Sequence, residues 1–269
     1  MAIPDALGII AGNGVYPLQL ASAARAAGVK RLVAAAFTGE TQAALADKVD
    51  VIEWLRVGQL GRMLNFFRAA NVTHAIMAGQ IAPKNLFDLR PDLKALVVLA
   101  RLKRRNAESL FRAIADELSK IGVELLPAYT FLENLLAPAG LIAGRALNRR
   151  EEADITFGFE IAKEVSRLDI GQTVVVKNGT VLAVEAFEGT NDAMQRGGAL
   201  GRTGAIVIKV AKPGQDMRFD VPVIGAATLA VAAAAKIRVI ALEAGRTLLL
   251  EKNELVEAAE RAGISIVGR

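Results

Sequence analysis

Short apolar runs alternate with amphipathic segments through the first half of the chain. Runs rich in Val, Ile, Leu and Ala are typical of buried strands, and apolar residues three and four positions apart are typical of helices. Their alternation predicts a parallel sheet with helices on its faces. The predicted strands are residues 7–10, 31–37, 51–55, 75–77 and 124–126, and the predicted helices are residues 17–27, 59–70, 93–103, 108–121 and 129–136.

The second half also mixes the two patterns, but it contains a hairpin signal. Asn178-Gly179 lies between two β-rich runs, and this dipeptide favours a tight antiparallel turn. The second half is therefore predicted to be α/β with strands of mixed direction. Its predicted helices are residues 151–167, 192–200, 228–235 and 253–262, and its predicted strands are residues 173–176, 181–185, 205–210, 237–241, 247–250 and 265–267.

A junction is predicted between the halves. Residues 137–150 contain Pro138, Gly140 and Gly144 and show no amphipathic period. We therefore predict an N-terminal domain over residues 1–136, a linker over 137–150 and a C-terminal α/β domain over 151–269.

Composition narrows the chemistry. The 269 residues are 53% hydrophobic, so the chain can fold into a packed core, and they include no cysteine and one histidine, His74. Disulfides, thiol nucleophiles and Cys-rich zinc sites are excluded, and any Ser-His-Asp triad would depend on His74. The net charge of +5 suits an anionic ligand or surface.

The chain shows no signal for export or for crossing a membrane. The start MAIPDALGII lacks a basic region followed by a long apolar core. The longest uncharged run, residues 221–235, is shorter than the ~20 residues of a spanning helix. We expect a cytoplasmic protein.

The loop after the first predicted strand can bind a phosphate. Gly12 and Gly14 place backbone amides before a helix, whose dipole favours negative charge. The full G-x-G-x-x-G pattern is broken by Pro17, and no Walker lysine follows. Alternatively, the two glycines only make a tight turn and Pro17 only begins the helix.

A polar cluster between a strand and a helix suggests a metal. It contains three carboxylates, Glu185, Glu188 and Asp192, with Thr190 and Asn191. Magnesium prefers oxygen ligands and commonly stabilises charge in phosphoryl chemistry. The alternative is helix capping, with Thr190 or Asn191 as the N-cap and Asp192 as a first-turn partner of the dipole.

Two further positions have both a structural and a functional interpretation. Arg218 lies between Asp216 and Asp220, where it can form an ion pair or clamp a diphosphate while an aspartate contacts metal or water. Lys84 lies in the loop after the fourth predicted strand. It is either a solvated surface lysine or a phosphate contact.

A basic run follows an apolar helix. Arg101, Lys103, Arg104 and Arg105 come directly after the apolar residues of the predicted helix 93–103. Such a segment can rest on an anionic membrane, or it is a solvated helix end. Aromatic residues are not interleaved with these bases, so we expect no nucleic-acid partner.

Five ordered blocks carry a family resemblance. They are residues 7–14 (LGIIAGNG) with Pro17, Gly79-Gln80 with Pro83 and Lys84, residues 171–175 (GQTVV), Glu185 with residues 188–194 (EGTNDAM), and residues 216–222 (DMRFDVP) with Ile224-Gly225. With these blocks the chain resembles the LpxI-type UDP-2,3-diacylglucosamine pyrophosphatases of lipid A biosynthesis. The resemblance implies a Rossmann-like N-terminal UDP-binding domain and a C-terminal catalytic domain, with the ligand site between them.

The resemblance also implies an activity and a set of residues. The expected reaction is magnesium-dependent hydrolysis that gives UMP and 2,3-diacylglucosamine 1-phosphate. The resemblance also implies peripheral contact with the inner membrane surface. It leaves open whether the protein forms a homodimer. Arg218 and Thr228 belong to the expected catalytic set, and Asp192, Asp220 and the position of Ala227 would arrange metal and water. Substrate binding would involve Gly12, Asn13, Gly14, Gly79, Gln80, Lys84, Glu188, Gly189 and Thr190.

One departure from the family pattern bears on activity. The pattern has an acidic residue just before the threonine of the Gly-x-x-Thr segment, whereas this chain has Ala227 before Thr228. Alanine can neither bind metal nor activate water, so the chain resembles an inactivated variant that binds substrate and turns it over poorly. The alternatives are that Asp220 or Asp192 holds the acidic role, or that the chain is a non-catalytic nucleotide-sugar or lipid-binding module. A nicotinamide-dependent oxidoreductase is the weaker enzymatic rival.

Overall fold

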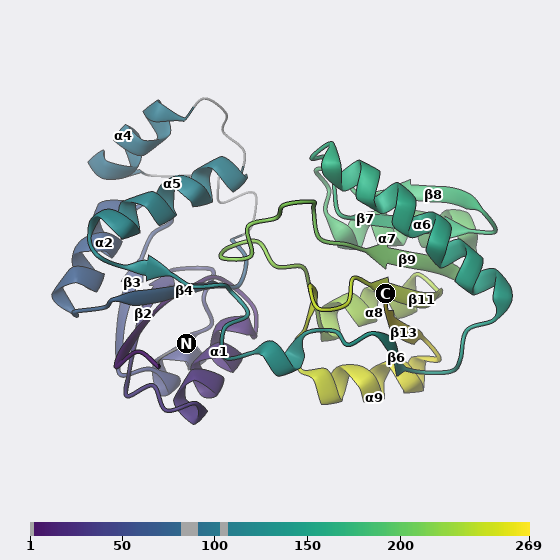
Figure 1. Ribbon diagram of the computed structural model, residues 1–269, viewed down its shortest axis with the longest axis horizontal. Helices are drawn as coiled ribbons and strands as arrows, with labels where there is room; N and C mark the ends of the chain where they lie inside the picture. Colours follow the sequence, from purple (N-terminus) through teal and green to yellow (C-terminus); the bar gives the residue numbers. More distant parts are fainter. Residues whose placement is uncertain (1–2, 82–90, 103–106) are drawn as a thin grey trace. The chain divides into compact units, whose positions relative to one another are not determined.

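The computed structural model describes residues 3–81, 91–102 and 107–269, and it divides the chain into two compact units (Figure 1). The first unit comprises Met1–Glu133 and Asp216–Asp220, and the second comprises Asn134–Gln215 and Val221–Arg269. In both units, helices cover a β-sheet. The α/β class predicted for each half is therefore confirmed.

The first unit contains a five-stranded parallel sheet with the order β3-β2-β1-β4-β5. This is the strand order of Rossmann-type sheets, in which the chain reverses direction across the sheet beside β1. The central strand β1 is buried along most of its length because helices cover both sheet faces. The elements are β1 (Ala6–Ala11), α1 (Tyr16–Ala26), β2 (Arg31–Phe37), η1 (Ala43–Lys48), β3 (Val51–Leu55), α2 (Leu60–Ala69), β4 (His74–Ala78), α4 (Leu93–Arg101), α5 (Ala107–Lys120) and β5 (Glu124–Leu125).

The second unit contains a six-stranded mixed sheet with the order β6-β13-β11-β9-β7-β8 and a two-stranded β10-β12 pair. The predicted Asn178-Gly179 hairpin is confirmed, since it joins the antiparallel strands β7 and β8. The elements are β6 (Gly140–Ala143), α6 (Arg149–Arg167), β7 (Thr173–Lys177), β8 (Thr180–Val184), α7 (Thr190–Gly201), β9 (Ala205–Lys209), β10 (Val223–Ile224), α8 (Ala226–Ala234), β11 (Ile237–Leu242), β12 (Leu248–Leu249), α9 (Lys252–Ala262) and β13 (Ser265–Gly268).

Alternating side chains give the second sheet two cores. Val174 and Val176 pack with α6 on one face, whereas Val175 packs with α7, α8 and α9 on the other. Successive residues of a strand point to opposite faces, so one apolar strand supplies both cores. Figure 1 shows the resulting layers, with α6 on one side of the sheet.

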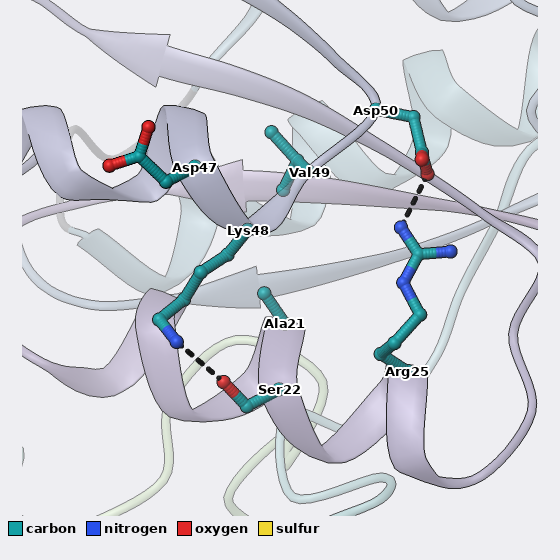
Figure 2. Close-up of a pocket in the computed structure, with 7 residues that line it drawn as sticks. All are labelled: Ala21, Ser22, Arg25, Asp47, Lys48, Val49 and Asp50. Carbon is teal, nitrogen blue, oxygen red and sulfur yellow. Dashed lines mark hydrogen bonds and ion pairs between the residues drawn. The ribbon is translucent and has the colours of Figure 1, made fainter.

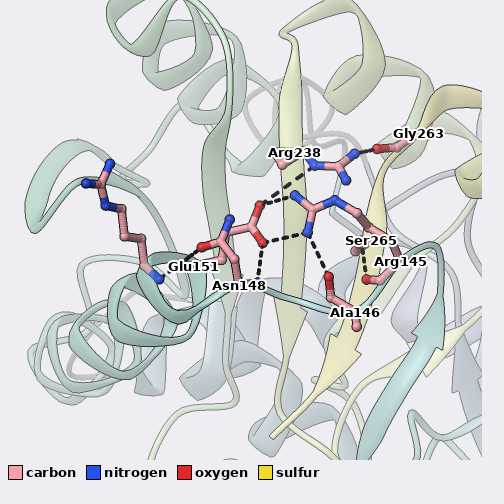
Figure 3. Close-up of polar contacts among 8 residues, drawn as sticks. Arg145, Ala146, Asn148, Glu151, Arg238, Gly263 and Ser265 are labelled. Atoms are coloured by element: carbon pink, nitrogen blue, oxygen red, sulfur yellow. Dashed lines mark hydrogen bonds and ion pairs between the residues drawn. The ribbon is translucent and has the colours of Figure 1, made fainter.

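The predicted linker residues 137–150 carry structure of their own. They contain β6, which pairs antiparallel with β13, and they lead into α6 through the Asn148 capping box. Figure 3 shows Arg145 bound to both carboxylate oxygens of Glu151, at 2.6 and 2.9 Å, with Arg238 of β11 beside the same carboxylate. The buried Glu151 carboxylate and the more exposed Arg145 guanidinium thus tie the segment to the second unit.

The predicted helix over residues 129–136 is wrong. The structure has only a short 3₁₀ turn, η2 (Glu133–Leu135). Phe131 adopts a positive φ of 70°, which interrupts a right-handed helix. The Thr130 and Leu132 amides donate to the carbonyls three residues back, those of Pro127 and Tyr129, as in isolated turns.

Candidate functional site

Two loops meet at the carboxyl edge of the first sheet. The loop after β1 carries Gly12 and Asn13, and the loop after β4 carries Gly79 and Gln80. The Asn13 amide donates to the Gln80 carbonyl at 2.7 Å, and the Gly12 amide donates to the Ala78 carbonyl at 2.8 Å. This edge, beside β1, is where open α/β sheets bind ligands. The structure therefore brings together four of the residues predicted to bind substrate.

The close approach of the loops requires glycine at two positions. A Cβ on Gly12 would lie 2.5 Å from the Gln80 carbonyl oxygen, and a Cβ on Gly79 would lie 2.5 Å from the Asn13 carbonyl oxygen. Gly79 also has a φ of 90°, which L-residues rarely adopt. Gly14, with a φ of 82°, faces open space. The glycines thus serve both the turn and the contact between loops.

Glu40 and Thr41 extend this edge, and the sequence analysis did not assign either to the site. The Asn13 side-chain amide donates to Glu40 Oε2 at 3.1 Å, and Glu40 is buried. The Thr41 hydroxyl accepts from the Phe37 amide and donates to the Ala11 carbonyl. The available signal was the Glu-Thr pair shortly after the apolar run 31–37, separated from it by Thr38-Gly39, because that strand ends at the same edge of the sheet.

The segment Asp216–Asp220 belongs to the first unit although it comes late in the sequence. The Met217 carbonyl accepts from the Ala128 amide at 2.7 Å, and the Tyr16 hydroxyl donates to the Ala128 carbonyl. The Phe219 ring packs on Phe111 of α5, with 5.6 Å between ring centroids. Because Tyr16 begins α1 directly after the glycine loop, Ala128 connects this loop to the Asp216–Asp220 segment.

Arg218 and Asp216 form a bidentate ion pair. Nε and Nη2 of Arg218 donate to the two carboxylate oxygens of Asp216 at 2.9 and 2.6 Å. The hydrogen bond from Arg218 holds the pKa of Asp216 below its usual range, and the same bond raises the pKa of Arg218. The predicted ion pair is therefore present. A guanidinium carries five N–H groups, so this pairing leaves donors for a phosphate oxygen.

Thr190 is the centre of a polar cluster in the second unit. Its hydroxyl donates to Glu185 Oε1 at 2.9 Å and accepts from Lys209 Nζ at 2.8 Å, and it lies 3.3 Å from the Thr173 hydroxyl. Thr173 is fully buried at the start of β7, and Lys209 ends β9. Thr190 was predicted from the sequence and Lys209 was not; its signal was a single charge within the apolar run 205–210.

Glu188 and Asp192 lie beside this cluster but have different surroundings. Glu188 pairs with Arg196 at 2.6 Å and accepts from the Ala186 amide. Gly189, with a φ of 87°, is the N-cap of α7, and Asp192 is an exposed acid in the first turn. Asp192 thus has the place expected of a partner of the helix dipole, as the capping alternative proposed.

Ala227 lies in the first turn of α8, two residues after the N-cap Gly225, whereas Asp192 lies three residues after the N-cap Gly189 of α7. α7 precedes β9 and α8 precedes β11, and because these strands are parallel both helices begin at the carboxyl edge of the pair. A Cβ on Gly198 would lie 2.3 Å from the Ala235 carbonyl oxygen, so the far ends of the helices are in close contact. Ala227 is exposed in the first turn of α8, next to the half-buried Thr228, and that turn contains no acidic residue.

The metal prediction is not matched by a cluster within either unit. Among the described residues, no group of three or more His, Asp or Glu side chains is arranged to hold a metal ion. The two predicted ligands, Asp192 and Asp220, belong to different units. The carboxylates of Asp216 and Glu188 are engaged by arginines. Lys84 lies outside the described residues.

A surface pocket of about 440 Å³ lies elsewhere on the first unit (Figure 2). The second half of α1 and the end of η1 line it, away from the glycine loop that precedes α1. Two contacts join residues that line it: Arg25 pairs with Asp50 at 2.6 Å, and Lys48 Nζ donates to the Ser22 hydroxyl at 3.1 Å. This pocket contains none of the predicted site residues.

The fold defines a two-domain α/β protein whose first sheet has the Rossmann strand order. The chain belongs to the LpxI family: the LpxI N-terminal domain matches residues 6–135, and the LpxI C-terminal domain matches residues 138–267. The UDP-2,3-diacylglucosamine pyrophosphatase LpxI of Caulobacter vibrioides is 34% identical over 97% of this chain and 96% of its own length.

Among solved structures, the biotin carboxylase domain of Hydrogenobacter thermophilus 2-oxoglutarate carboxylase is 12% identical and has a TM-score of 0.30. The match covers 67% of this chain and 36% of the other. A likeness of this size carries no argument about fold or function. No helix in the described ranges is long and apolar enough to span a bilayer.

Proposed function

We propose that this protein hydrolyses the diphosphate of UDP-2,3-diacylglucosamine, as a member of the lipid A pathway. The observation that carries the proposal is the full-length relationship to the Caulobacter pyrophosphatase. Water adds to one phosphorus, the P–O–P link to the other phosphorus breaks, and the products are UMP and 2,3-diacylglucosamine 1-phosphate. Family membership also supports a hydrolase acting on a phosphorus anhydride.

The residues of the first unit have roles in binding. Gly12, Asn13, Gly14, Gly79 and Gln80 hold the UDP part, because their backbone groups lie at the ligand-binding edge of the sheet beside a helix N-terminus. Arg218 contacts a phosphate with the N–H groups that Asp216 does not use. Lys84 is a further phosphate contact in this proposal.

The residues of the second unit have roles in charge stabilisation. Gly189 and Gly225 are the N-caps of α7 and α8, and in neither helix does a described side chain cap the N-terminus. These two helix starts, with the hydroxyls of Thr190 and Thr228, favour negative charge on the substrate at the carboxyl edge of β9 and β11. Glu188, whose carboxylate pairs with Arg196, is a proposed substrate contact on the family resemblance. Lys209, which bonds Thr190, adds a positive charge at the same edge.

Magnesium is part of the proposal on the family resemblance alone. Asp192 and Asp220 would be its ligands, although within the described ranges no three His, Asp or Glu side chains are grouped to hold a metal ion.

Ala227 lowers the expected turnover. An acidic residue here would lie in the first turn of α8, at the edge that carries Asp192 and Lys209, where it could orient or deprotonate water. The test is UMP release from the lipid-linked substrate by this chain and by Ala227→Asp. Ala226→Asp is the matched control, because it adds the same charge to the same helix turn. We expect Ala227→Asp to release UMP at least tenfold faster and Ala226→Asp to change little.

The second candidate is a nucleotide-sugar or lipid-binding module without catalysis, which the alanine at position 227 favours. Uridine nucleotide binding by both the chain and Ala227→Asp, without UMP release by either in the presence of magnesium, would support this candidate and overturn the hydrolase. A thermal shift with NAD but not with UDP would instead support an oxidoreductase.

A further inference from the structure

Helix α4 of the first unit presents an apolar stripe to solvent. Leu93 is 80% exposed, Leu96 52% and Val97 44%, and Ala100 is exposed on the same face. These positions follow the three- and four-residue spacing of one helix face. Single exposed apolar residues are ordinary on protein surfaces, whereas an aliphatic stripe along a whole helix indicates a contact surface.

The stripe is held in its outward position. Asp92 caps α4 by accepting from the Ala95 amide at 2.9 Å, and the same carboxylate accepts from the Gly61 amide at 2.7 Å. Ala95 and Val98 are buried in the core of the first unit. Lys94 of α4 pairs at 2.5 Å with the buried Glu117 of α5. The helix therefore cannot roll to bury the stripe without losing these contacts.

The position of α4 within its unit leaves the stripe accessible. Figure 1 shows α4 beyond α5, on the outer side of the helical layer and away from the sheet. One apolar face packs against the unit and the opposite one faces outward, so the helix has the character of an interfacial element rather than of a core helix.

The charge beside the stripe of α4 and the small area of the stripe indicate which kind of partner covers it. Arg101 is exposed in the last turn, and the sequence continues with Lys103, Arg104 and Arg105, which lie outside the described residues. Arg101 in the last turn of α4, together with the basic sequence that follows the helix, matches an anionic lipid surface. A second copy of the chain fits less well, because one face of a nine-residue helix offers far less than the ~800 Å² per partner of a stable interface.

We propose that Leu93, Leu96 and Val97 of α4 insert into the interface of an anionic bilayer. The proposal deepens the proposed function and rests on it in one respect: a diacylated substrate resides in a membrane, so contact with that surface brings the enzyme to it. The contact is peripheral and reversible, since three aliphatic side chains bury little area and the basic residues act through a screened potential.

The first experiment measures co-flotation with vesicles of phosphatidylcholine alone or mixed with phosphatidylglycerol. Leu93→Asp/Leu96→Asp removes the stripe, and Leu168→Asp/Leu200→Asp is the control, because it adds the same charge at two leucines that are 58% and 63% exposed in the second unit. We expect the chain and the control to bind the anionic vesicles, and the α4 variant to bind at least tenfold less. Equal binding by the two variants, or no binding by the chain itself, overturns the proposal.

A second measurement does not depend on a loss of binding. Trp54 is the only tryptophan, so Leu96→Trp in a Trp54→Phe background reports on α4 alone. Its emission should shift to shorter wavelength with anionic vesicles and not with neutral ones. An unchanged spectrum overturns the proposal, as does a light-scattering result in which the α4 variant loses a dimer while vesicle binding is unaltered.

UMP release from detergent-dispersed substrate separates this inference from the proposed function. Each α4 variant should hydrolyse dispersed substrate at the rate of its own parent, either the chain or Ala227→Asp, because α4 contains none of the proposed site residues. Vesicle binding without hydrolysis in any variant overturns the proposed function alone, and hydrolysis without vesicle binding overturns the α4 proposal alone.

Discussion

The Asn13 amide and the Gln80 carbonyl are joined by a 2.7 Å hydrogen bond that fastens the loop after β1 to the loop after β4. The two residues also form an antiparallel bridge outside the parallel sheet. This bond fixes the backbone at the edge where we propose that UDP binds. Disturbing it should affect substrate binding more than it affects the fold.

Gly79→Ala tests this junction. A Cβ at Gly79 would lie 2.5 Å from the Asn13 carbonyl oxygen, so the loops must separate. Gly122→Ala is the matched control, because Gly122 also has a positive φ of 79° but has no atom within 4 Å of its Cβ position. We expect Gly79→Ala to lower the free energy of unfolding by ~1–3 kcal/mol and uridine nucleotide affinity by about tenfold or more, and Gly122→Ala to lower stability alone. Equal affinity in the two variants would remove the junction from the binding site.

Thr190→Val tests the cluster in the second unit. Valine keeps the side-chain shape but removes the hydroxyl that joins Glu185 to Lys209, which should cost ~1–3 kcal/mol of stability. Thr156→Val is the control, since Thr156 is exposed and its hydroxyl donates to a carbonyl of its own helix. UMP release should fall only in Thr190→Val. If denaturant unfolding and hydrolysis both match the control, the cluster has neither role.

The lowered pKa of Glu117 predicts that the protein loses part of its free energy of unfolding in acid. Hydrogen bonds from Lys120 and Lys94 lower the pKa of this buried carboxyl below its ordinary value of 4.5. A lowered folded-state pKa contributes stability above pH 4.5 that is lost as the pH falls through the folded pKa. Glu117→Gln should therefore lose less stability than the parent chain between about pH 7 and pH 3. Glu257→Gln, at a 70% exposed side chain, should keep the parent profile.

Thr247 offers a stabilising substitution. Its side chain is fully buried, and within the described part of the chain its hydroxyl has no hydrogen-bond partner. Thr247→Val removes the unpaired hydroxyl at nearly constant volume and should raise the free energy of unfolding by ~1 kcal/mol. Thr247→Ala also removes the hydroxyl but leaves a cavity, so it should gain less. A clear destabilisation by valine in urea unfolding would show that the hydroxyl is hydrogen-bonded in solution.

The magnesium proposal predicts that chelation stops hydrolysis and that added magnesium restores it. In whichever of the chain and Ala227→Asp is active, Asp192→Asn and Asp220→Asn should each lower UMP release by about a hundredfold and raise the magnesium concentration needed for half-maximal rate. Asp47→Asn, at an exposed residue of the pocket in Figure 2, is the control. Full activity after exhaustive chelation would exclude magnesium as the cofactor.

The sequence predicted most elements because their signals are local. The strands at Arg31–Phe37 and Val51–Leu55 have the bounds expected from their apolar runs. The Asn178-Gly179 turn follows from the chemistry of two adjacent residues. By contrast, the four-residue β6 is too short to show a period, and its partner β13 is more than a hundred residues away.

Some residues of the candidate site were likewise recognisable from local sequence, and others were not. The glycines at 12, 14 and 79 were recognisable because a loop between an apolar strand and a helix needs them. Glu40 and Lys209 were not recognised, because a single charged residue after an apolar run has no distinctive local pattern.

The sequence by itself determined the α/β class, the division into two halves and the glycine-containing loops, since periodicity and turn chemistry act over a few residues. Only the tertiary structure decided that Asp216–Asp220 joins the first unit, that Asn13 bonds Glu40, and that Lys209 reaches Thr190. The reason is physical: which distant surfaces bury each other depends on the shape of the assembled core, and a polar group finds its partner only after that core has formed.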